Sequence, residues 1–325
     1  MSATYRQILF TGPRRAECVT RANESPPLGS REVRGATLAS LVSSGTEMGV
    51  YRTVSGETST GYAAVFRVDE IGSDVTEAQP GDVAFTMGPH RSFQRCNVAD
   101  AVPVPPRLDP KHAVFARLMG VTMSTLTTTE ARPPSKVILS GLGPVGHLGA
   151  RIFASAGYDV IGIDPDERRR GIAEAAGFRT VMPRIPLDDP KVRDQVTLVV
   201  ECSGHEQAIL DACRVVRKRG EVVLVGVPWV KKTDITAHKL LREVFHRYVV
   251  LRSGWEWEVP VHPEEFRVNS ILGNIAAAMD WIADGRIEVS GLYETALPEN
   301  ATDVYRLIDE GATSSLAVVF DWTAS

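Results

Sequence analysis

Short segments rich in β-branched and aromatic residues recur through the first third of the chain, each bounded by glycine, proline or polar residues. These segments predict strands at residues 5–10, 32–40, 63–71, 82–86 and 101–104. Pairs such as Gly12-Pro13, Pro26-Pro27 and Pro80-Gly81 supply turns between them. The pattern predicts a β-rich region that closes into a small barrel.

The pattern changes after Pro133, where strand-length apolar runs alternate with helical periodicity. Strands are predicted at 136–140, 159–164, 196–201 and 221–225, and helices at 145–156 and 166–176. Such alternation is typical of a parallel, doubly wound sheet. Near the C-terminus we expect an amphipathic helix at 269–284 and then two or three short strands ending at Phe320.

The order of these elements predicts a discontinuous outer domain with an α/β domain inserted into it. We expect residues 1–118 and 263–325 to form the barrel domain and residues 119–262 to form the doubly wound domain. The length of 325 residues agrees with two domains of ordinary size.

Composition and net charge indicate which kind of molecule the protein binds. Hydrophobic residues make up 43% of the chain and charged residues 23%, as in soluble globular proteins. A net charge of -4 offers no general attraction to nucleic acid or anionic membranes, so a small molecule is the expected partner. We see no export signal and no apolar run of about 18 residues. Four cysteines without a CxxC pair favour free thiols, and we expect a cytoplasmic protein.

A glycine-rich segment carries the clearest chemical signal. The sequence GLGPVG, Gly141 to Gly146, follows an apolar strand and opens a helix. In such loops the first glycine permits a tight turn, the second lets the backbone approach a pyrophosphate, and the third allows close packing of helix on strand. The predicted dinucleotide-binding residues are Gly141, Gly143, Pro144, Val145, Gly146, Asp164, Arg169, Cys202, Ser203, Gly226 and Val227.

Asp164 bears on the choice of cofactor. It ends the next predicted strand, 18 residues after Gly146, close to the spacing of about 20 expected for the carboxylate that binds the adenosine ribose. A carboxylate accepts hydrogen bonds from a free 2′-hydroxyl and repels a 2′-phosphate, which favours NAD over NADP. Arg168, Arg169 and Arg170 follow, and their guanidinium groups either reach a phosphate or form a solvated helix face.

Three further motifs occur in an order that identifies a family resemblance. They are SSGTEMGVY from Ser43 to Tyr51, then Gly61-Tyr62-Ala63, then Pro80-Gly81-Asp82-Val83. They resemble the CGTD stretch, the GHE motif and the GD turn of the medium-chain dehydrogenase/reductase superfamily, and the resemblance extends over nearly the whole chain. It implies a GroES-like barrel joined to a Rossmann domain, a nicotinamide cofactor and an oxidoreductase activity.

The chain departs from the zinc-dependent members of this superfamily. Those members bind catalytic zinc with the Cys of CGTD, the His of GHE and a third downstream residue. Ser44 and Tyr62 occupy the first two positions here, and neutral hydroxyls are poor zinc ligands. The lobe of four cysteines for structural zinc is also missing before Cys96. We therefore predict no metal. The SGTE version resembles a subgroup that includes bacteriochlorophyll-pathway hydroxyethyl dehydrogenases and enzymes of secondary metabolism.

Without zinc, side chains must stabilise the developing oxyanion and transfer the proton. The candidates are Ser44 and Thr46 as hydroxyl donors, Tyr62 as an acid, His90 as an acid or base in a solvent-accessible cleft, and Glu47 as the residue that orients Tyr62, His90 or a cofactor ribose. Each has an ordinary structural alternative: turn hydrogen bonds for the two hydroxyls, a buried strand tyrosine, a surface histidine, and an ion pair for the glutamate.

Three functions are compatible with these residues. The leading hypothesis is a zinc-independent dehydrogenase or ketoreductase acting on a secondary alcohol or ketone, such as a cyclitol, a sugar or a natural-product intermediate. The second is reduction of an activated carbon–carbon double bond, as in enoyl and quinone reductases. The third is a dinucleotide-binding sensor or scaffold without catalysis. Residues 248–253 form a predicted sheet edge, and the resemblance implies that this edge pairs with its twin in a homodimer.

Overall fold

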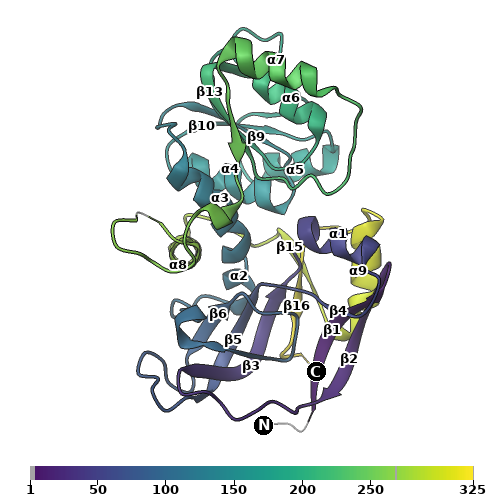
Figure 1. Ribbon diagram of the computed structural model, residues 1–325, viewed down its shortest axis with the longest axis vertical. Helices are drawn as coiled ribbons and strands as arrows, with labels where there is room; N and C mark the ends of the chain where they lie inside the picture. The colour runs from purple at the N-terminus through teal and green to yellow at the C-terminus, as the bar shows by residue number, and fades with distance from the viewer. Residues whose placement is uncertain (1–3, 268, 325) are drawn as a thin grey trace. The chain divides into compact units, whose positions relative to one another are not determined.

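The computed structural model of the protein describes residues 4–267 and 269–324 and contains two compact units (Figure 1). The first unit consists of Met1–Arg117 and Ile275–Ser325, and the second of Leu118–Asn274. The chain therefore returns to the first unit at residue 275, later than the predicted 263. The delay has a local cause, because the backbone amides at the start of the last long helix donate to Pro260 and Val261, which ties this segment to the second unit.

The first unit is built from strands arranged in two sheets. A seven-stranded sheet has the order β15-β16-β3-β5-β6-β8, with β7 pairing to β3, and a three-stranded sheet has the order β2-β1-β4. The predicted GroES-like barrel domain is confirmed. Its strands are β1 (Thr4–Gly12), β2 (Arg15–Ala22), β3 (Glu32–Leu41), β4 (Thr58–Ser59), β5 (Ala64–Ile71), β6 (Val83–Thr86), β7 (Phe93–Asn97), β8 (Val102–Pro103), β15 (Tyr293–Ala296) and β16 (Ala317–Asp321).

Two helices of the first unit were not expected from the sequence. Helix α1 (Ser44–Thr53) contains most of the SSGTEMGVY motif, for which no element was predicted, and α9 (Ala301–Asp309) lies where only short strands were predicted. Both pack through aromatic rings, and the centroids of Phe10 and Tyr305 lie 4.9 Å apart in an edge-to-face arrangement. The unit's other helical segments are η1 (Val98–Asp100), α2 (Pro110–Ala113) and η3 (Pro298–Asn300).

The second unit contains a six-stranded parallel sheet of order β11-β10-β9-β12-β13-β14, which confirms the predicted doubly wound Rossmann domain. Its strands are β9 (Lys136–Ser140), β10 (Asp159–Ile163), β11 (Val181–Met182), β12 (Val196–Glu201), β13 (Val216–Leu224) and β14 (Val250–Ser253). Its helices are α4 (Pro144–Ser155), α5 (Glu167–Ala175), α6 (Glu206–Val215), α7 (Ala237–Arg247) and η2 (Glu256–Glu258). Helices α3 (Ala116–Thr128) and α8 (Ile271–Ala283) contain the two crossing points.

Alternate side chains of the central strands enter two separate cores, one on each face of this sheet. Leu139 and Val200 pack with Phe153 of α4, whereas Ile138 and Val199 belong to the cluster that includes Cys213 of α6. This double burial explains why the central strands read as continuous apolar runs in the sequence. No described helix is long and apolar enough to cross a membrane.

Candidate functional site

The glycine loop of the second unit has the geometry expected of a dinucleotide cradle. Gly141 has a φ of +90°, a conformation that suits glycine. A Cβ added to Gly146 would lie 1.7 Å from the carbonyl oxygen of Gly141, so the third glycine allows helix α4 to pack directly on the loop. These two contacts match the roles assigned to the first and third glycines of the motif.

The middle glycine leaves room for a ligand at the start of α4. A Cβ on Gly143 would meet only the Arg169 guanidinium, at 3.9 Å. Gly143 is the N-cap of α4 and Pro144 and Val145 begin its first turn. Gly143 provides no side-chain cap, so the partial positive charge of the helix N-terminus is available to a phosphate. The loop therefore fits a bound pyrophosphate.

The Asp164 carboxylate accepts hydrogen bonds from the backbone of the glycine loop. Its side chain is 2% exposed. One carboxylate oxygen accepts from the backbone of Leu142 at 2.7 Å and the other from the backbone of Asp166 at 2.8 Å. The Arg169 guanidinium lies 3.5 Å from the first of these oxygens. The predicted ribose ligand is thus a structural acceptor too, and its nearest cation is one of the three consecutive arginines.

The other residues predicted to bind the cofactor come shortly after the carboxyl ends of strands β12 and β13. Cys202 and Ser203 come directly after β12, and the Ser203 amide donates to the buried Glu201 carboxylate at 2.8 Å. Gly226 follows β13, where a Cβ would lie 2.3 Å from the amide nitrogen of Gly204. Val227 is partly exposed beside it. These residues and the glycine loop share the carboxyl edge of the sheet around β9 and β12, where doubly wound folds change strand direction and bind nucleotides. The residues present fit a dinucleotide.

A cluster of hydroxyl groups forms the candidate chemical site of the first unit. Tyr62 follows Gly61, which has a φ of +90°. The Tyr62 hydroxyl donates to the Thr46 hydroxyl at 3.2 Å and also shares a short hydrogen bond with the Ser43 hydroxyl. The Arg117 guanidinium lies over the ring, 4.7 Å from its centroid. Burial raises the pKa of the Tyr62 phenol, while the two hydroxyl contacts and Arg117 oppose that rise.

Glu47 is the buried anion behind this cluster. Its carboxylate accepts from the Ser43 backbone amide at 2.7 Å and from the Thr60 hydroxyl at 2.7 Å, and Tyr305 donates a further short hydrogen bond. Burial disfavours the charged carboxylate, but the His90 ring and these hydrogen bonds outweigh it and lower the pKa of Glu47. The expectation that Glu47 orients a neighbouring group agrees with its contact to His90, at 3.3 Å.

His90 does not face a solvent-accessible cleft, so that expectation was wrong, and it is not a surface histidine either. The ring is fully buried, with Nδ1 2.7 Å from the Ser40 hydroxyl and Nε2 facing Glu47. Trp322 donates to the same Ser40 hydroxyl at 2.9 Å. The turn is short, and Gly61 packs against it so closely that a Cβ would lie 2.6 Å from the His90 backbone nitrogen. His90 therefore acts as internal support for Glu47.

The serine that meets Tyr62 is Ser43, one residue ahead of the predicted Ser44. Ser43 lies at the N-cap of α1, while Ser44 begins the first turn of the helix. The segment is helical, and this winding places the hydroxyl of the N-cap Ser43 against the tyrosine. Arg117 and Tyr305 complete the site without having been predicted, because neither motif spacing nor local periodicity connects them to Tyr62 and Glu47.

This donor set does not fit a zinc ion. The oxygen donors nearest Tyr62 are neutral hydroxyls, and the Arg117 cation already lies over the same ring. Zinc prefers thiolate and imidazole ligands, and the one nearby imidazole, His90, has both ring nitrogens directed at other side chains. Across residues 4–267 and 269–324 no three His, Cys, Asp or Glu side chains gather as a metal site.

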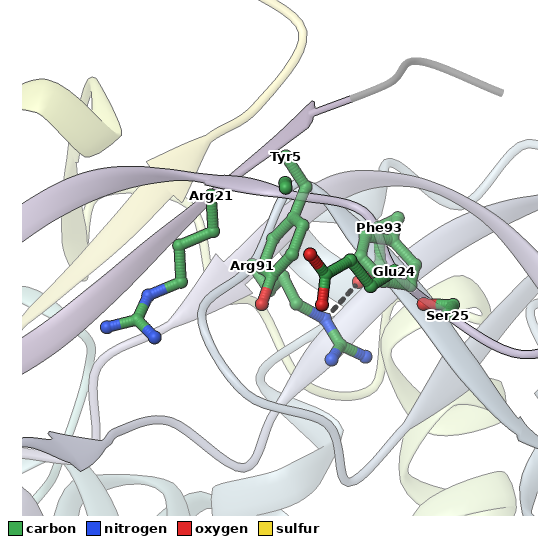
Figure 2. A pocket seen from close by; sticks show the side chains of 7 residues that line it. Tyr5, Arg21, Glu24, Ser25, Arg91 and Phe93 are labelled. Carbon is green, nitrogen blue, oxygen red and sulfur yellow. Dashed lines mark hydrogen bonds between the residues drawn. The ribbon is translucent and has the colours of Figure 1, made fainter.

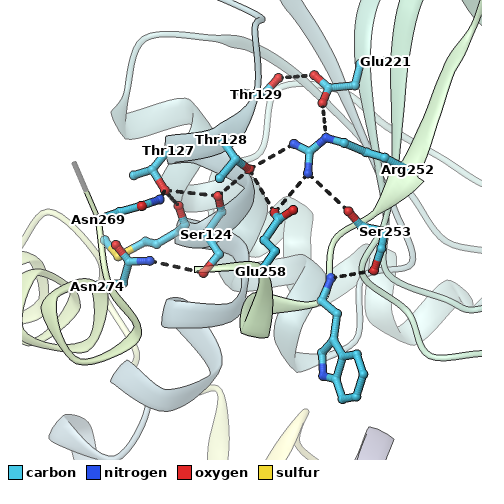
Figure 3. A network of polar contacts seen from close by, with 12 residues as sticks. Ser124, Thr127, Thr128, Thr129, Glu221, Arg252, Ser253, Glu258, Asn269 and Asn274 are labelled. Carbon is cyan, nitrogen blue, oxygen red and sulfur yellow. Dashed lines mark hydrogen bonds and ion pairs between the residues drawn. The ribbon is translucent and has the colours of Figure 1, made fainter. Parts of the chain in front are cut away.

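Each unit also contains a surface hollow. In the first unit a hollow of about 530 Å³ is lined by Tyr5, Arg21, Ala22, Glu24, Ser25, Arg91 and Phe93, and Figure 2 shows Arg91 bonded to the Phe93 carbonyl. In the second unit, Figure 3 shows Arg252 joined to Glu221, Glu258 and Thr128 beside a smaller hollow of about 360 Å³. In the first hollow Tyr5, Arg91 and Phe93 contact one another, and in the second Thr128 donates to Glu258.

Comparisons with known proteins agree with this geometry. Residues 144–258 match the family model described as zinc-binding dehydrogenase. A 2-dehydro-3-deoxy-L-galactonate 5-dehydrogenase from Pseudoalteromonas atlantica is 27% identical over 130 residues, which cover 38% of this chain and 38% of that relative. The chain therefore spans well under two thirds of this curated relative.

Solved structures match over nearly the whole chain, at low identity. Galactitol-1-phosphate dehydrogenase from Escherichia coli superposes with a TM-score of 0.81 at 13% identity, covering 97% of this chain and 99% of that one. Acetophenone reductase from Geotrichum candidum, in complex with NAD, gives 0.80 at 16% identity, covering 100% and 99%. Residues 144–258 thus match the zinc-binding dehydrogenase family, and the chain as a whole has the fold of these dehydrogenase and reductase structures.

Proposed function

We propose that this protein is a zinc-independent oxidoreductase that interconverts a secondary alcohol and a ketone with a nicotinamide cofactor. The observation that carries the proposal is the Tyr62 cluster, in which the phenol contacts two hydroxyls and a buried carboxylate accepts from the backbone amide of Ser43, which bears one of them. The cofactor would supply or accept the hydride. Relatives named for sugar and alcohol oxidation, such as the galactonate dehydrogenase, favour a polyol or related natural-product substrate.

Tyr62 is the proposed proton donor in the direction of reduction. A tyrosine phenol is protonated at neutral pH, which is the form needed to donate to an alkoxide, and burial raises the pKa of Tyr62 further. Ser43 and Thr46 contact the phenol oxygen and would stabilise it after the proton has left. Glu47 fixes Ser43 through its backbone amide, so that the donor keeps one orientation. Ser44, one residue further on, is no longer our preferred donor.

We propose NAD as the cofactor, with NADP less favoured. Support comes from the Asp164 carboxylate, which would repel a 2′-phosphate. The guanidinium of Arg169, 3.5 Å away, reduces that repulsion without removing it. The same residue would contact the adenosine end of either cofactor.

The experiment is a turnover assay that follows reduced nicotinamide with a panel of ketones, polyols and enones, using NADH and NADPH in parallel. Tyr62→Phe should lower kcat for a ketone by about 10² to 10⁴, the usual contribution of a general acid. Tyr5→Phe, which removes a hydroxyl elsewhere in the same unit, should leave kcat within about threefold.

Three results would redirect the proposal. Turnover of enones but not ketones would favour the reductase of carbon–carbon double bonds. Absence of any turnover, with the dinucleotide still bound, would favour the sensor. Loss of ketone turnover on removing a stoichiometric zinc ion would contradict zinc independence.

We further propose a homodimer formed through β14. This strand is the outer strand of the six-stranded sheet, and exposed parallel or antiparallel edges are seldom left unpaired. Tyr248 and Val250 are 69% and 51% exposed, and Trp255 just beyond the strand is 66% exposed. An apolar group of this kind beside an open edge favours burial against a second copy.

A further inference from the structure

A buried arginine lies against the proposed proton donor. Arg117 is the second residue of α3 and is only 4% exposed. Its guanidinium carbon lies 4.7 Å from the centroid of the Tyr62 ring. The phenol therefore has hydroxyl partners at its oxygen and a fixed positive charge over its face.

This is an unfavourable position for an arginine on structural grounds. A cation loses solvation when it is buried, and the N-terminal end of a helix carries a partial positive charge that repels it. A methionine or leucine would fill the same volume without either cost. A charge that is retained at such a place is expected to have a chemical role.

The charged groups that act on Tyr62 come from two elements. Arg117 belongs to α3 and Glu47 to α1, and their effects are opposite. Burial raises the pKa of the Tyr62 phenol and Glu47 adds to the rise, whereas Arg117 lowers it. Arg117 is thus the one charged side chain of this described group that favours the phenolate.

We propose that Arg117 is a positioning residue that acts through Tyr62, stabilising the phenolate left when Tyr62 gives up its proton. The inference rests on the proposed function. In reduction, a bound nicotinamide cofactor would supply the hydride for the new C–H bond, and the Tyr62 O–H bond would break as its proton passed to the substrate oxygen. The remaining negative charge spreads into the ring, directly beneath the guanidinium. A fixed side-chain cation would serve where zinc-dependent relatives use a metal.

The test places a fluorinated tyrosine at position 62 and follows its ¹⁹F resonance as pH is raised. The fluorine makes the phenol more acidic, so that it titrates while the protein is folded, and the signal reports residue 62 alone. Arg117→Met should raise the titration midpoint by about 1 to 3 pH units, the usual effect of one neighbouring charge. Arg117→Lys, which keeps the charge, should raise it by less than about 1 unit.

Arg91→Met is the matched control, because Arg91 also has its guanidinium over an aromatic ring, 4.1 Å from the centroid of Phe93. It should leave the Tyr62 midpoint unchanged. If Arg117→Met does not fold, Arg117→Gln provides the same neutral comparison. An unchanged midpoint in a folded neutral variant would overturn the inference.

This titration needs no substrate, so its failure is distinguishable from failure of the proposed function. With a ketone that is turned over, Arg117→Met should lower kcat and shift its pH profile by a similar amount while leaving KM within about threefold. A rise in KM alone, with kcat and the pH profile preserved, would assign Arg117 to substrate binding and contradict a role through Tyr62.

Discussion

A single buried carboxylate, that of Glu47, fixes the backbone beside the hydroxyl groups around Tyr62. Glu47 has its carboxylate bonded from four directions, by Ser43, Thr60, His90 and Tyr305. The sequence identified Glu47 and His90 as polar residues near the motifs, but it could not show that Tyr305, 258 positions from Glu47, completes the arrangement. Contacts over such separations depend on the closed barrel and leave no local pattern in the sequence.

Asp321 is another buried carboxylate of the first unit, and the stability that its ion pair provides should depend on pH. Lys111 forms an ion pair with Asp321 at 2.6 Å. Burial opposes the Asp321 charge, but the Lys111 contact and Thr323 outweigh it and lower its pKa to about 2. Because the folded pKa lies below the ordinary value of 3.8, this stabilisation is present above about pH 4 and is lost as pH falls toward 2.

Lys111→Met should therefore lower the free energy of unfolding by about 1 to 2 kcal/mol near neutral pH, and the difference should vanish near pH 2. Urea unfolding at both pH values provides the measurement. Arg67→Met, which breaks an exposed pair with Asp69, is the control and should change stability by less than about 0.5 kcal/mol. A difference that persists undiminished at low pH would rule out the ion pair as its source.

Among the elements, the central strands were predicted most accurately, because burial on both faces makes their signal strong. Strands β9 and β12 begin and end at the predicted residues. Helix α1 was missed although its signal was present: a serine followed by Glu47 is a capping pattern, and Glu47 does accept from the N-cap amide. Helix α7 was missed although its pattern was present, because Leu240 and Val244 of its packed face lie at helical spacing.

An ion-pair network joins α3, β13 and β14 in the second unit (Figure 3). Arg252 donates to Glu221 at 2.5 Å, and the Glu221 side chain is 11% exposed. Arg252→Met would leave this carboxylate without its cation, so the free energy of unfolding should fall by about 2 to 3 kcal/mol. Arg193→Met, whose partner Asp194 is half exposed, should cost less than about 0.5 kcal/mol in the same denaturation measurement. Equal losses would mean that Glu221 is adequately solvated.

At the scale of the whole molecule, the sequence predicted two domains and their fold, because alternation of strand and helix persists over many residues. It could not fix the later crossing, which depends on backbone hydrogen bonds to Pro260 and Val261. It also could not reveal that apolar side chains gather beside the β14 edge, since single exposed hydrophobic residues have no distinctive pattern.

The proposed β14 dimer has a direct test in solution. Val250→Lys places a charge on the open edge, where it would be buried between two copies, and should shift the protein toward monomer in sedimentation experiments. Leu297→Lys, at an exposed apolar position of the first unit, should leave the sedimentation coefficient unchanged. A native protein that sediments as a monomer, or a dimer unaffected by Val250→Lys, would refute pairing through this edge.

The two backbone amides that converge on Asp164 have a consequence for how cofactor choice can change. The carboxylate that would discriminate between NAD and NADP also fastens the loop that cradles either one. Exchanging it for a neutral residue would therefore relax selectivity and loosen the cradle together. Cofactor selectivity at Asp164 is therefore coupled to the stability of the loop. Substitutions at the neighbouring Arg168 and Arg169 would change the preference between NAD and NADP with less loss of stability, because the Asp164 carboxylate would still accept from the two amides.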